Sequence, residues 1–427
     1  MEVANERAAQ GRTKDAVTTA SSVSMEDLQQ LGERVTNLNE RIKQVIFRPE
    51  GMKAPPVFNA AQVAELCGQS YEKFKRLLQR AGERGLPTGA GKKAVSEEGA
   101  SASRNRMFTL EDARAWVRAE GSMHHRAEGQ QGAVITVGNF KGGVGKTVLS
   151  MSLAQGLSLR GYKVLCIDYD PQGSLTSLFG LTPTDFDAEE TVMPLMLPRD
   201  REGARSTLQE SIKASYWDGI DLVPGNSSLF AGEFFLPIRQ QAALMKNSAE
   251  PNFLFLEVLE NALRLGPRDE YDFIIIDTPP ALSYLTMTTY WAADALLVPL
   301  PPEGLDFTSS GQFFSMMAEL AGTDRGLASK VYSWIGVVPS KVDNTKLHTK
   351  EILKWMQDGF GRHLLNLEIP ETAAVRVGGM SLNTVYDISK YVGSRKTLLR
   401  ARDAYDKAVD LVEHMTRSTL WRNANPA

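Results

Sequence analysis

Two lysines flank a short run of glycines at residues 139–147, which read NFKGGVGKT. An apolar run precedes this segment and a helix-forming run follows it. Glycines between a strand and a helix allow backbone N–H groups to close around phosphates. Lys146 can then reach the β- and γ-phosphates of a nucleotide, and the Thr147 hydroxyl can ligate Mg²⁺. The sequence therefore predicts a phosphate-binding loop that consists of Lys141, Gly142, Gly143, Val144, Gly145, Lys146, Thr147 and Val148.

Two further apolar runs end in aspartates. Residues 162–167 lead into Asp168 and Asp170, and residues 273–276 lead into Asp277. A carboxylate at the carboxyl end of a strand is well placed to position water, which is the main task of a protein in phosphoryl transfer. An aspartate in this place can also be only a cap or turn residue.

The glycine segment departs from the common pattern G-x-x-x-x-G-K-[ST], because Phe140 replaces the first glycine and Lys141 is an additional lysine. Its form, K-G-G-x-G-K-T, resembles the deviant Walker A loop of the ParA/MinD ATPases. The D-x-D-P-Q-G motif that begins at Asp168 resembles a motif of ParA proteins, and the run that ends at Asp277 resembles a Walker B element. The three elements follow one another in the order that this family shows.

The resemblance implies a role for each charged residue. Lys141 would reach across a nucleotide-sandwich homodimer to the phosphates of the partner subunit. Asp170 would orient or polarise the attacking water, and Asp277 would bind Mg²⁺ directly or through its water. The implied cofactors are ATP or ADP and Mg²⁺. The implied catalytic residues are Lys141, Lys146 and Asp170, and the implied metal site consists of Thr147, Asp168 and Asp277.

From residue 133 onward, short apolar runs alternate with helical stretches, and further strands are expected at 295–300, 332–338 and 364–369. This alternation predicts an α/β fold with a doubly wound, mostly parallel sheet and ligands at the carboxyl ends of its strands. Loops at 339–343 and 370–372 follow the last two strands. We expect them to flank the adenine, although loops lie at this edge in any such fold.

Before residue 120 the pattern changes. A helix is expected at 25–47, with an apolar stripe at heptad spacing formed by Leu28, Leu31, Val35, Leu38, Ile42 and Val45. The stripe suits dimerisation and packing on the same chain about equally, because the run is shorter than four heptads. Residues 1–24 are rich in Ala, Ser and Thr and are expected to be disordered.

Residues 51–120 are typical of a winged helix-turn-helix DNA-binding domain. Asn59 is expected to cap a first helix, a turn at Gly68 follows, and Ser70 is expected to cap a second helix with Phe74 on its inner face. Gln69 occupies a turn position that is usually apolar in this motif. A Gly- and Ser-rich stretch after the second helix is expected to form a wing loop.

The second helix and the wing are basic, with nine Lys or Arg against three Glu between residues 73 and 106, a local net charge of +6. A recognition helix enters the major groove while basic neighbours hold phosphates. We expect Tyr71, Lys75 and Gln79 to read bases, and a helical pair with a solvated basic face is the alternative. The other expected DNA contacts in this domain are Lys73, Arg76, Arg104 and Arg106.

Residues 121–132 are polar and predict a flexible linker to an ATPase domain at 133–427. Near the end of the chain, Arg395, Lys396 and Arg400 begin a helix. In ParA proteins, basic residues near the C-terminus bind DNA without regard to sequence, and such contacts are electrostatic. A solvated surface cluster explains the pattern almost as well.

Composition limits the class of protein. At 427 residues the chain can form two or three domains, and its net charge of −3 predicts no partner by itself. The two cysteines, Cys67 and Cys166, suggest a reducing cytoplasm and no structural disulfide. No apolar run approaches the ~20 residues that span a bilayer, so no membrane association is expected.

With the resemblance, these features predict a plasmid or replicon partition protein that is cytoplasmic and nucleoid-associated. ATP would favour a homodimer on nonspecific nucleoid DNA, and a ParB-type centromere-binding partner would stimulate slow hydrolysis. The helix-turn-helix domain would bind the operator DNA of its own operon and so autoregulate transcription.

Two alternatives stay open. A MinD-type division-site ATPase shares the loop, but it anchors to membranes by a basic, apolar C-terminal helix and has no N-terminal DNA-binding domain. Acidic residues on the C-terminal helix of this chain count against it, because an anionic membrane repels them. The second alternative is a nucleotide-responsive transcriptional repressor with no role in partition.

Overall fold

The computed structural model describes residues 24–46, 53–91, 106–121, 126–245, 250–323, 330–371, 383–387 and 394–421. The chain divides into two compact units, residues 1–52 and 53–427. In the first unit, helix α1 spans Met25–Ile46, which confirms the expected helix. Its side chains Leu28, Leu31, Val35 and Leu38 are more than half exposed, and dimerisation through them stays a prediction. The expected disorder of residues 1–23 lies outside the described residues.

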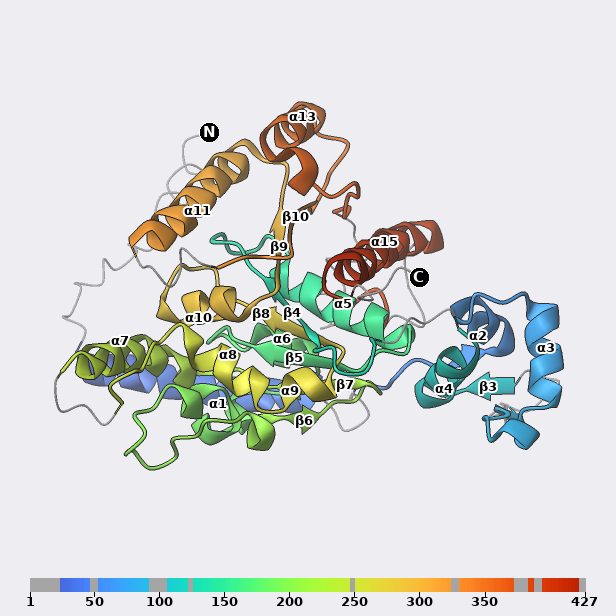
Figure 1. Cartoon of the computed structure of the whole chain (residues 1–427), viewed down its shortest axis with the longest axis horizontal. Coiled ribbons are helices and arrows are strands. Elements are labelled where there is room, and N and C mark those ends of the chain that lie inside the picture. The colour runs from blue at the N-terminus through green and yellow to red at the C-terminus, as the bar shows by residue number, and fades with distance from the viewer. Residues whose placement is uncertain are drawn as a thin grey trace, which may run out of the picture. The chain divides into compact units, whose positions relative to one another are not determined.

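The second unit is built on a seven-stranded sheet with the strand order β10-β9-β4-β8-β5-β7-β6 (Figure 1). Six strands run parallel and β6 pairs antiparallel with β7 at the edge. The doubly wound, mostly parallel sheet is therefore confirmed. The strands are β4 (Ala133–Val137), β5 (Val164–Asp168), β6 (Lys213–Ala214), β7 (Ile220–Val223), β8 (Phe273–Asp277), β9 (Ala295–Leu300) and β10 (Trp334–Pro339).

One expected strand is wrong. Residues 364–369 form one isolated parallel bridge, Leu364 with Val337, and a second one, Pro370 with Val342, follows the segment. The N–H of Leu367 donates to the carbonyl of Leu365 at 2.8 Å, so the backbone turns locally and leaves no continuous ladder beside β10. The sequence analysis also missed β7 and the edge strand β6, which are short.

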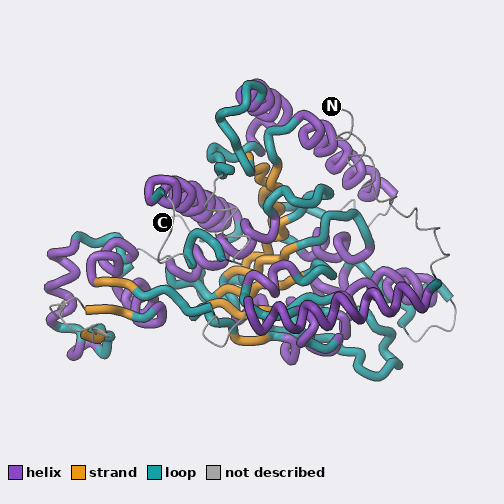
Figure 2. The backbone as a smooth tube through the Cα atoms, turned by 180° about the vertical axis from the view of Figure 1, so that it is seen from behind, coloured by secondary structure: helices purple, strands orange, loops and turns teal. Residues whose placement is uncertain are grey.

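Alternate residues of the strands point to opposite faces of the sheet, and helices bury both faces (Figures 1 and 2). Helices α5 and α15 pack on one face, and α7, α8 and α10 pack on the other. Helices α11 and α13 cover the end of the sheet at β9 and β10. The helices are α5 (Lys146–Leu159), α6 (Ser174–Leu178), α7 (Gly232–Ala243), α8 (Glu257–Arg264), α9 (Pro267–Glu270), α10 (Tyr284–Ala292), α11 (Gly304–Thr323), α13 (Thr349–Phe360) and α15 (Arg395–Thr419).

Short 3₁₀ helices occur mainly in the long connections between these elements. They are η2 (Gly82–Arg84), η3 (Pro183–Asp185), η4 (Ala188–Glu190), η5 (Met193–Leu195), η6 (Gln209–Ser211), η7 (Ser227–Ala231) and η8 (Gly361–His363).

The N-terminal part of the second unit, the α2–α4 segment, comprises residues 53–121. Asn59 accepts hydrogen bonds from the N–H groups of Ala61 and Gln62, and Ser70 accepts one from Lys73, so both expected caps are present. Phe74 is fully buried, as expected. The strands β1, β3 and β2 form a small antiparallel sheet beside the helices. The elements are β1 (Phe58–Asn59), α2 (Ala60–Leu66), α3 (Tyr71–Gln79), β2 (Ala90–Gly91), β3 (Arg106–Phe108) and α4 (Leu110–Glu120).

The α2–α4 segment packs directly on the sheet domain. Its buried Trp116 and Val117 belong to the same apolar core as α5 and α15. Residues 126–132, expected to be part of a flexible linker, are bound to the sheet domain: Arg126 contacts Asp272 at 3.1 Å, and the N–H of Gly132 donates to the carbonyl of Arg268. The α2–α4 segment is therefore joined to the sheet domain by packing contacts as well as by the chain that connects them.

The contact between α5 and α15 leads to a stability prediction. A Cβ atom added at Gly156 of α5 would lie 2.4 Å from Cγ2 of Val409 on α15. We expect Gly156→Ala to destabilise the protein by about 1–3 kcal/mol, because the two helices must move apart. The midpoint of urea unfolding, followed by circular dichroism, measures this loss.

Gly311 of α11 provides the matched control, because an added Cβ would meet no atom within 4 Å. Gly311→Ala should leave the free energy of unfolding unchanged or raise it by about 0.5–1 kcal/mol, since alanine favours a helix. Equal midpoints for Gly156→Ala and the unsubstituted protein would contradict the close packing of these helices.

Candidate functional site

The glycine segment lies between the end of β4 and the start of α5, as predicted. Gly143 and Gly145 have φ angles of 73° and 97°, a region that favours glycine. A Cβ atom at either position would meet no atom within 4 Å, so the backbone of the loop borders open space. No side chain caps the start of α5. The first N–H groups of a helix lack intrahelical partners, and here they are suited to an anion.

The Lys146 side chain is buried within this loop. Its ammonium donates to the carbonyl of Asn139 at 3.1 Å and to the carbonyl of Lys141 at 2.9 Å. Burial lowers the pKa of Lys146, and the charges of Asp277 and Asp170 act in the opposite direction. The lysine thus folds back onto the loop that it is expected to complete when a phosphate binds.

Asp277 ends β8 and is fully buried. Its Oδ1 accepts a hydrogen bond from the Ser150 hydroxyl at 3.0 Å, while its Oδ2 has no partner at ordinary hydrogen-bond geometry among the described residues. Burial and the charge of Asp168 raise the pKa of Asp277 to about 8, against the lowering effects of Thr147, Lys146 and Ser150. A buried carboxylate oxygen without a partner fits a cation ligand, which is what a magnesium site beside Thr147 requires.

Asp168 lies opposite Asp277 on the neighbouring strand β5. Its Oδ2 accepts from the N–H and the hydroxyl of Thr176, both at 2.7 Å, and its Oδ1 accepts from the N–H of Asp170 at 3.2 Å. Burial raises its pKa to about 7. Asp168 therefore holds the turn that leads into α6, and its predicted place at the metal stays a prediction.

The turn positions Asp170 at the cavity, where it is nearly buried. Its Oδ1 accepts from the N–H of Gln172 at 2.9 Å. Lys141, the additional lysine, is half-exposed and its ammonium forms an ion pair with Oδ1 of Asp306, in the first turn of α11. The structure thus gives Lys141 a partner within its own chain, and its predicted action across a dimer stays a prediction.

Lys146, Thr147 and Asp170 line a cavity of ≈ 410 Å³ at the carboxyl edge of the sheet, whereas Lys141, Asp168 and Asp277 are not among its lining residues. The Ser340 hydroxyl donates to the carbonyl of Val144 at 2.9 Å and so joins the loop after β10 to the phosphate loop. The sequence analysis missed Ile369 and Tyr405, since both read only as apolar core positions. Besides residues 142–149 and Asp170, the cavity is lined by Ser174, Pro280, Pro299, Ser340, Lys341, Ile369, Pro370, Glu371 and Tyr405.

Both loops expected to flank the adenine border this cavity, through Ser340 and Lys341 in one and Pro370 and Glu371 in the other. In the described part of the chain, no three or more His, Cys, Asp or Glu side chains form a metal-binding group.

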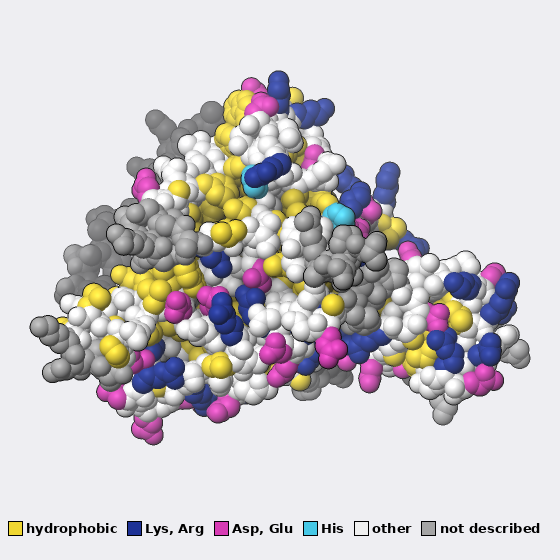
Figure 3. Space-filling view, viewed as in Figure 1, with side chains coloured by type: hydrophobic (Ala, Val, Ile, Leu, Met, Phe, Trp, Pro, Cys, Tyr) yellow, Lys and Arg dark blue, Asp and Glu magenta, His cyan; other side chains and the backbone are white. Residues whose placement is uncertain are grey.

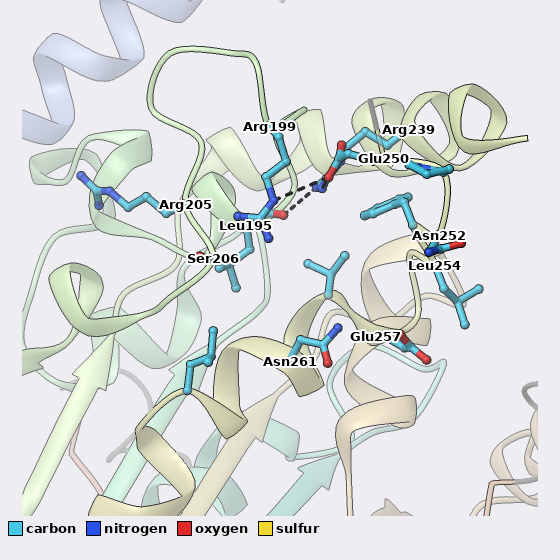
Figure 4. A pocket seen from close by; sticks show the side chains of 14 residues that line it. Leu195, Arg199, Arg205, Ser206, Arg239, Glu250, Asn252, Leu254, Glu257 and Asn261 are labelled. Carbon is cyan, nitrogen blue, oxygen red and sulfur yellow. Dashed lines mark hydrogen bonds and ion pairs between the residues drawn. The ribbon is translucent and has the colours of Figure 1, made fainter. Parts of the chain in front are cut away.

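A second cavity, of ≈ 320 Å³, lies among α7, α8 and the loops beside them (Figure 4). Its central Arg239 pairs with Glu250 at 2.7 Å and donates to the carbonyl of Leu195, and Arg199 approaches Glu250 at 3.6 Å. Two arginines thus share one carboxylate here, and none of the lining residues belongs to the phosphate loop. It is not the candidate nucleotide site.

Four expected DNA contacts come together on the α2–α4 segment. Tyr71, Lys75 and Gln79 of α3 and Arg106 of β3 line a groove of ≈ 940 Å³. Lys and Arg side chains recur over this segment in Figure 3. The other candidates are not part of the groove: Lys73 and Arg76 are exposed on α3, Arg104 lies outside the described residues, and Arg395, Lys396 and Arg400 are exposed on α15.

No helix in the described ranges combines the length and the apolar character that crossing a membrane requires.

A family profile described as an AAA domain matches residues 132–325. A putative replication protein A of Rhizobium rhizogenes is 30% identical over 387 residues, which cover 88% of this chain and 91% of the relative. Protein SopA of Escherichia coli K12 is 28% identical over 346 residues, 79% of this chain and 82% of SopA. A solved structure titled "Partition Protein" shares the fold, with a TM-score of 0.62 at 18% identity over 91% of this chain and 99% of that one.

The match to the Rhizobium relative includes the phosphate loop and continues beyond the matched domain on at least one side. The strand before the deviant loop, β4, and the two strands that end in aspartates, β8 and β5, are neighbours in the sheet. On these grounds we conclude that the chain belongs to the ParA family of partition ATPases.

Proposed function

We propose that this protein is an ATP-dependent partition ATPase that dimerises on ATP, hydrolyses it slowly and binds DNA at two sites. The observation that carries the proposal is the glycine loop whose buried Lys146 lines one cavity together with Asp170, while the buried Asp277 acts electrostatically on the same lysine. Relatives named as a putative replication protein and as a plasmid partition protein support the biological role.

In this proposal the backbone N–H groups of Gly143 and Gly145 and the Lys146 ammonium hold the phosphates of ATP or ADP. The Thr147 hydroxyl and Asp277 hold Mg²⁺, which when bound neutralises charge on the phosphates. Asp170, at the cavity beside the loop, orients the attacking water. The enclosing loops exclude other water and position these groups before the reaction.

Dimerisation would exchange one partner of Lys141 for another. Its ammonium leaves Asp306 of its own chain and meets the phosphates bound by the second subunit, so that the homodimer forms when ATP is present. A ParB-type partner stimulates hydrolysis and returns the protein to the free state. Nonspecific nucleoid DNA binds the exposed basic residues at the start of α15, Arg395, Lys396 and Arg400.

Operator DNA would bind the groove between α3 and β3. Tyr71, Lys75 and Gln79 would contact the bases, and Arg106, which lines the same groove, would hold a phosphate. The groove favours sequence-specific binding, and with it autoregulation of transcription, over a merely solvated basic face.

A measurement of ATP turnover tests the proposal. We expect slow hydrolysis by the protein alone and a synergistic increase when nonspecific DNA and the product of the adjacent reading frame are added together. Lys146→Ala should lower nucleotide affinity roughly 10- to 150-fold, since charge-assisted hydrogen bonds contribute about 1.5–3 kcal/mol. Lys350→Ala, at an exposed position of α13, is the control. Turnover indifferent to both additions would instead favour a repressor without a partition role.

Two substitutions separate turnover from dimerisation. Lys141→Gln and Asp170→Ala should each lower turnover at least about a hundredfold, the scale of one transition-state contact. Asp170→Ala should still dimerise with ATP, whereas Lys141→Gln should not, because only Lys141 is assigned to the partner's phosphates. Sedimentation velocity with a slowly hydrolysed ATP analogue measures the dimer. An ATP-dependent dimer of Lys141→Gln would contradict the cross-subunit role.

The two DNA sites can also be separated. Lys75→Gln combined with Gln79→Ala should weaken binding to the DNA upstream of the coding region by about 1–3 kcal/mol per lost base contact. ATPase stimulation by nonspecific DNA should persist, because the basic residues of α15 are unchanged. Electrophoretic mobility shift and turnover assays measure the two effects, and simultaneous loss of both would show that the sites are not independent.

A further inference from the structure

Helix α5 has the phosphate loop at one end and the α2–α4 segment at the other. It contains 14 residues and is therefore about 21 Å long at ~1.5 Å per residue. Its first residues, Lys146 and Thr147, line the nucleotide cavity. Its last residues and the turn that follows contact α4 of the groove-bearing segment. One element thus spans the distance between the two proposed binding sites.

Two arginines of α4 hold the end of α5, and we call them the arginine clamp. The Arg114 guanidinium, 2% exposed, donates through Nε to the carbonyl of Ser158 at 2.8 Å and through Nη2 to that of Tyr162 at 2.8 Å. Arg118 donates to the carbonyl of Gly161 at 3.0 Å. The last carbonyls of a helix lack intrahelical partners, and cations there are favoured by the helix dipole. The clamp therefore binds one carbonyl in the last turn of α5, which also accepts from the N–H of Gly161, and two carbonyls in the turn that follows the helix.

The turn beside the clamp is shaped to receive it. Arg114 also pairs with Asp218. A Cβ atom at the next residue, Gly219, would lie 2.0 Å from Cζ of Arg114, so the guanidinium occupies the space of a side chain there. The Ser158 hydroxyl donates to the carbonyl of Asp218 at 2.7 Å. The clamp, the end of α5 and this turn are thus connected by hydrogen bonds and an ion pair.

A second polar junction holds the same segment farther along α5. Asp387 accepts from Nε2 of Gln155, on α5, at 3.0 Å and from the ammonium of Lys53, at the start of the α2–α4 segment, at 2.8 Å. Both charged side chains are less than a tenth exposed. Apolar contacts alone permit sliding, whereas buried directional bonds fix an orientation. The α2–α4 segment is therefore held to α5 at two points, so its orientation depends on the position of that helix.

From this arrangement we infer that Arg114 and Arg118 are positioning residues that transmit nucleotide occupancy from the phosphate loop to the DNA-binding groove. Phosphate binding draws the Lys146 ammonium away from the carbonyls of Asn139 and Lys141 and alters the first turn of α5. A closely packed helix shifts as a unit, and the clamp makes the α2–α4 segment move with it. The inference rests on the proposed nucleotide site, and because coupling is reciprocal, DNA in the groove changes nucleotide affinity equally.

Amide hydrogen exchange of the full chain with and without Mg·ADP tests the inference, with a fluorescent ADP titration run in parallel. In the unsubstituted protein, exchange should change several-fold in both α5 and residues 110–120. In Arg118→Gln and in Arg114→Lys, α5 should still respond while residues 110–120 should not. Nucleotide affinity should stay within about twofold, since the clamp does not touch the cavity.

Conservative and remote variants distinguish positioning from general stability. Arg118→Lys keeps one donor for the carbonyl of Gly161 and should restore the response, whereas Arg114→Lys should not, because an ammonium cannot replace the planar fork on two carbonyls. Arg264→Gln breaks an exposed ion pair with Glu260 on α8 and should change nothing in α4.

Three results would overturn the inference. The first is an unsubstituted protein in which α5 responds to Mg·ADP but residues 110–120 do not. The second is a full response of residues 110–120 in both Arg118→Gln and Arg114→Lys. The third is the absence of ADP binding in the titration, which would overturn the proposed nucleotide function as well and is recognised separately from the exchange data.

Discussion

The structure depends on two opposite charges that are buried together with incomplete partners. The Lys146 ammonium has three donors and binds two loop carbonyls, and Oδ2 of Asp277 has no partner of ordinary geometry in the described chain. A buried charge is costly unless it is paired and hydrogen-bonded. In the proposed function, an anion at the loop and a cation at the carboxylate would give both groups a further partner.

The sheet topology creates this site from distant parts of the sequence. Strand β8 lies between β4 and β5, so Asp277 stands between the phosphate loop and the Asp168–Asp170 turn. All three strands are parallel and present their carboxyl ends at one edge, where open α/β sheets bind ligands. Helices on both faces of the sheet bury the carboxyl groups of Asp168 and Asp277 away from water. This burial is the main cause of their raised pKa values.

The same charges connect the site to its surroundings. Lys141 has an ion-pair partner in Asp306, so in the proposed dimer Lys141 would exchange this partner for the phosphates of the second subunit. On the other side, α5 links the site to the α2–α4 segment through bonds that a flexible linker would not supply. In the proposed function, a few polar groups therefore connect nucleotide binding, dimerisation and DNA binding.

The amino-acid sequence by itself determined the features that depend on neighbours in the chain. The apolar runs of β4, β5, β8 and β9, the glycines of the phosphate loop and the caps at Asn59 and Ser70 were all predictable, because each is specified by residues within a few positions. Tertiary structure alone decided that Thr176 hydrogen-bonds Asp168 and that Asp306 forms an ion pair with Lys141. It also decided that Arg114 hydrogen-bonds the end of α5 and that residues 364–369 form no strand. These outcomes depend on which distant groups the packed sheet and helices bring within hydrogen-bond distance, and no local pattern of residue types carries that information.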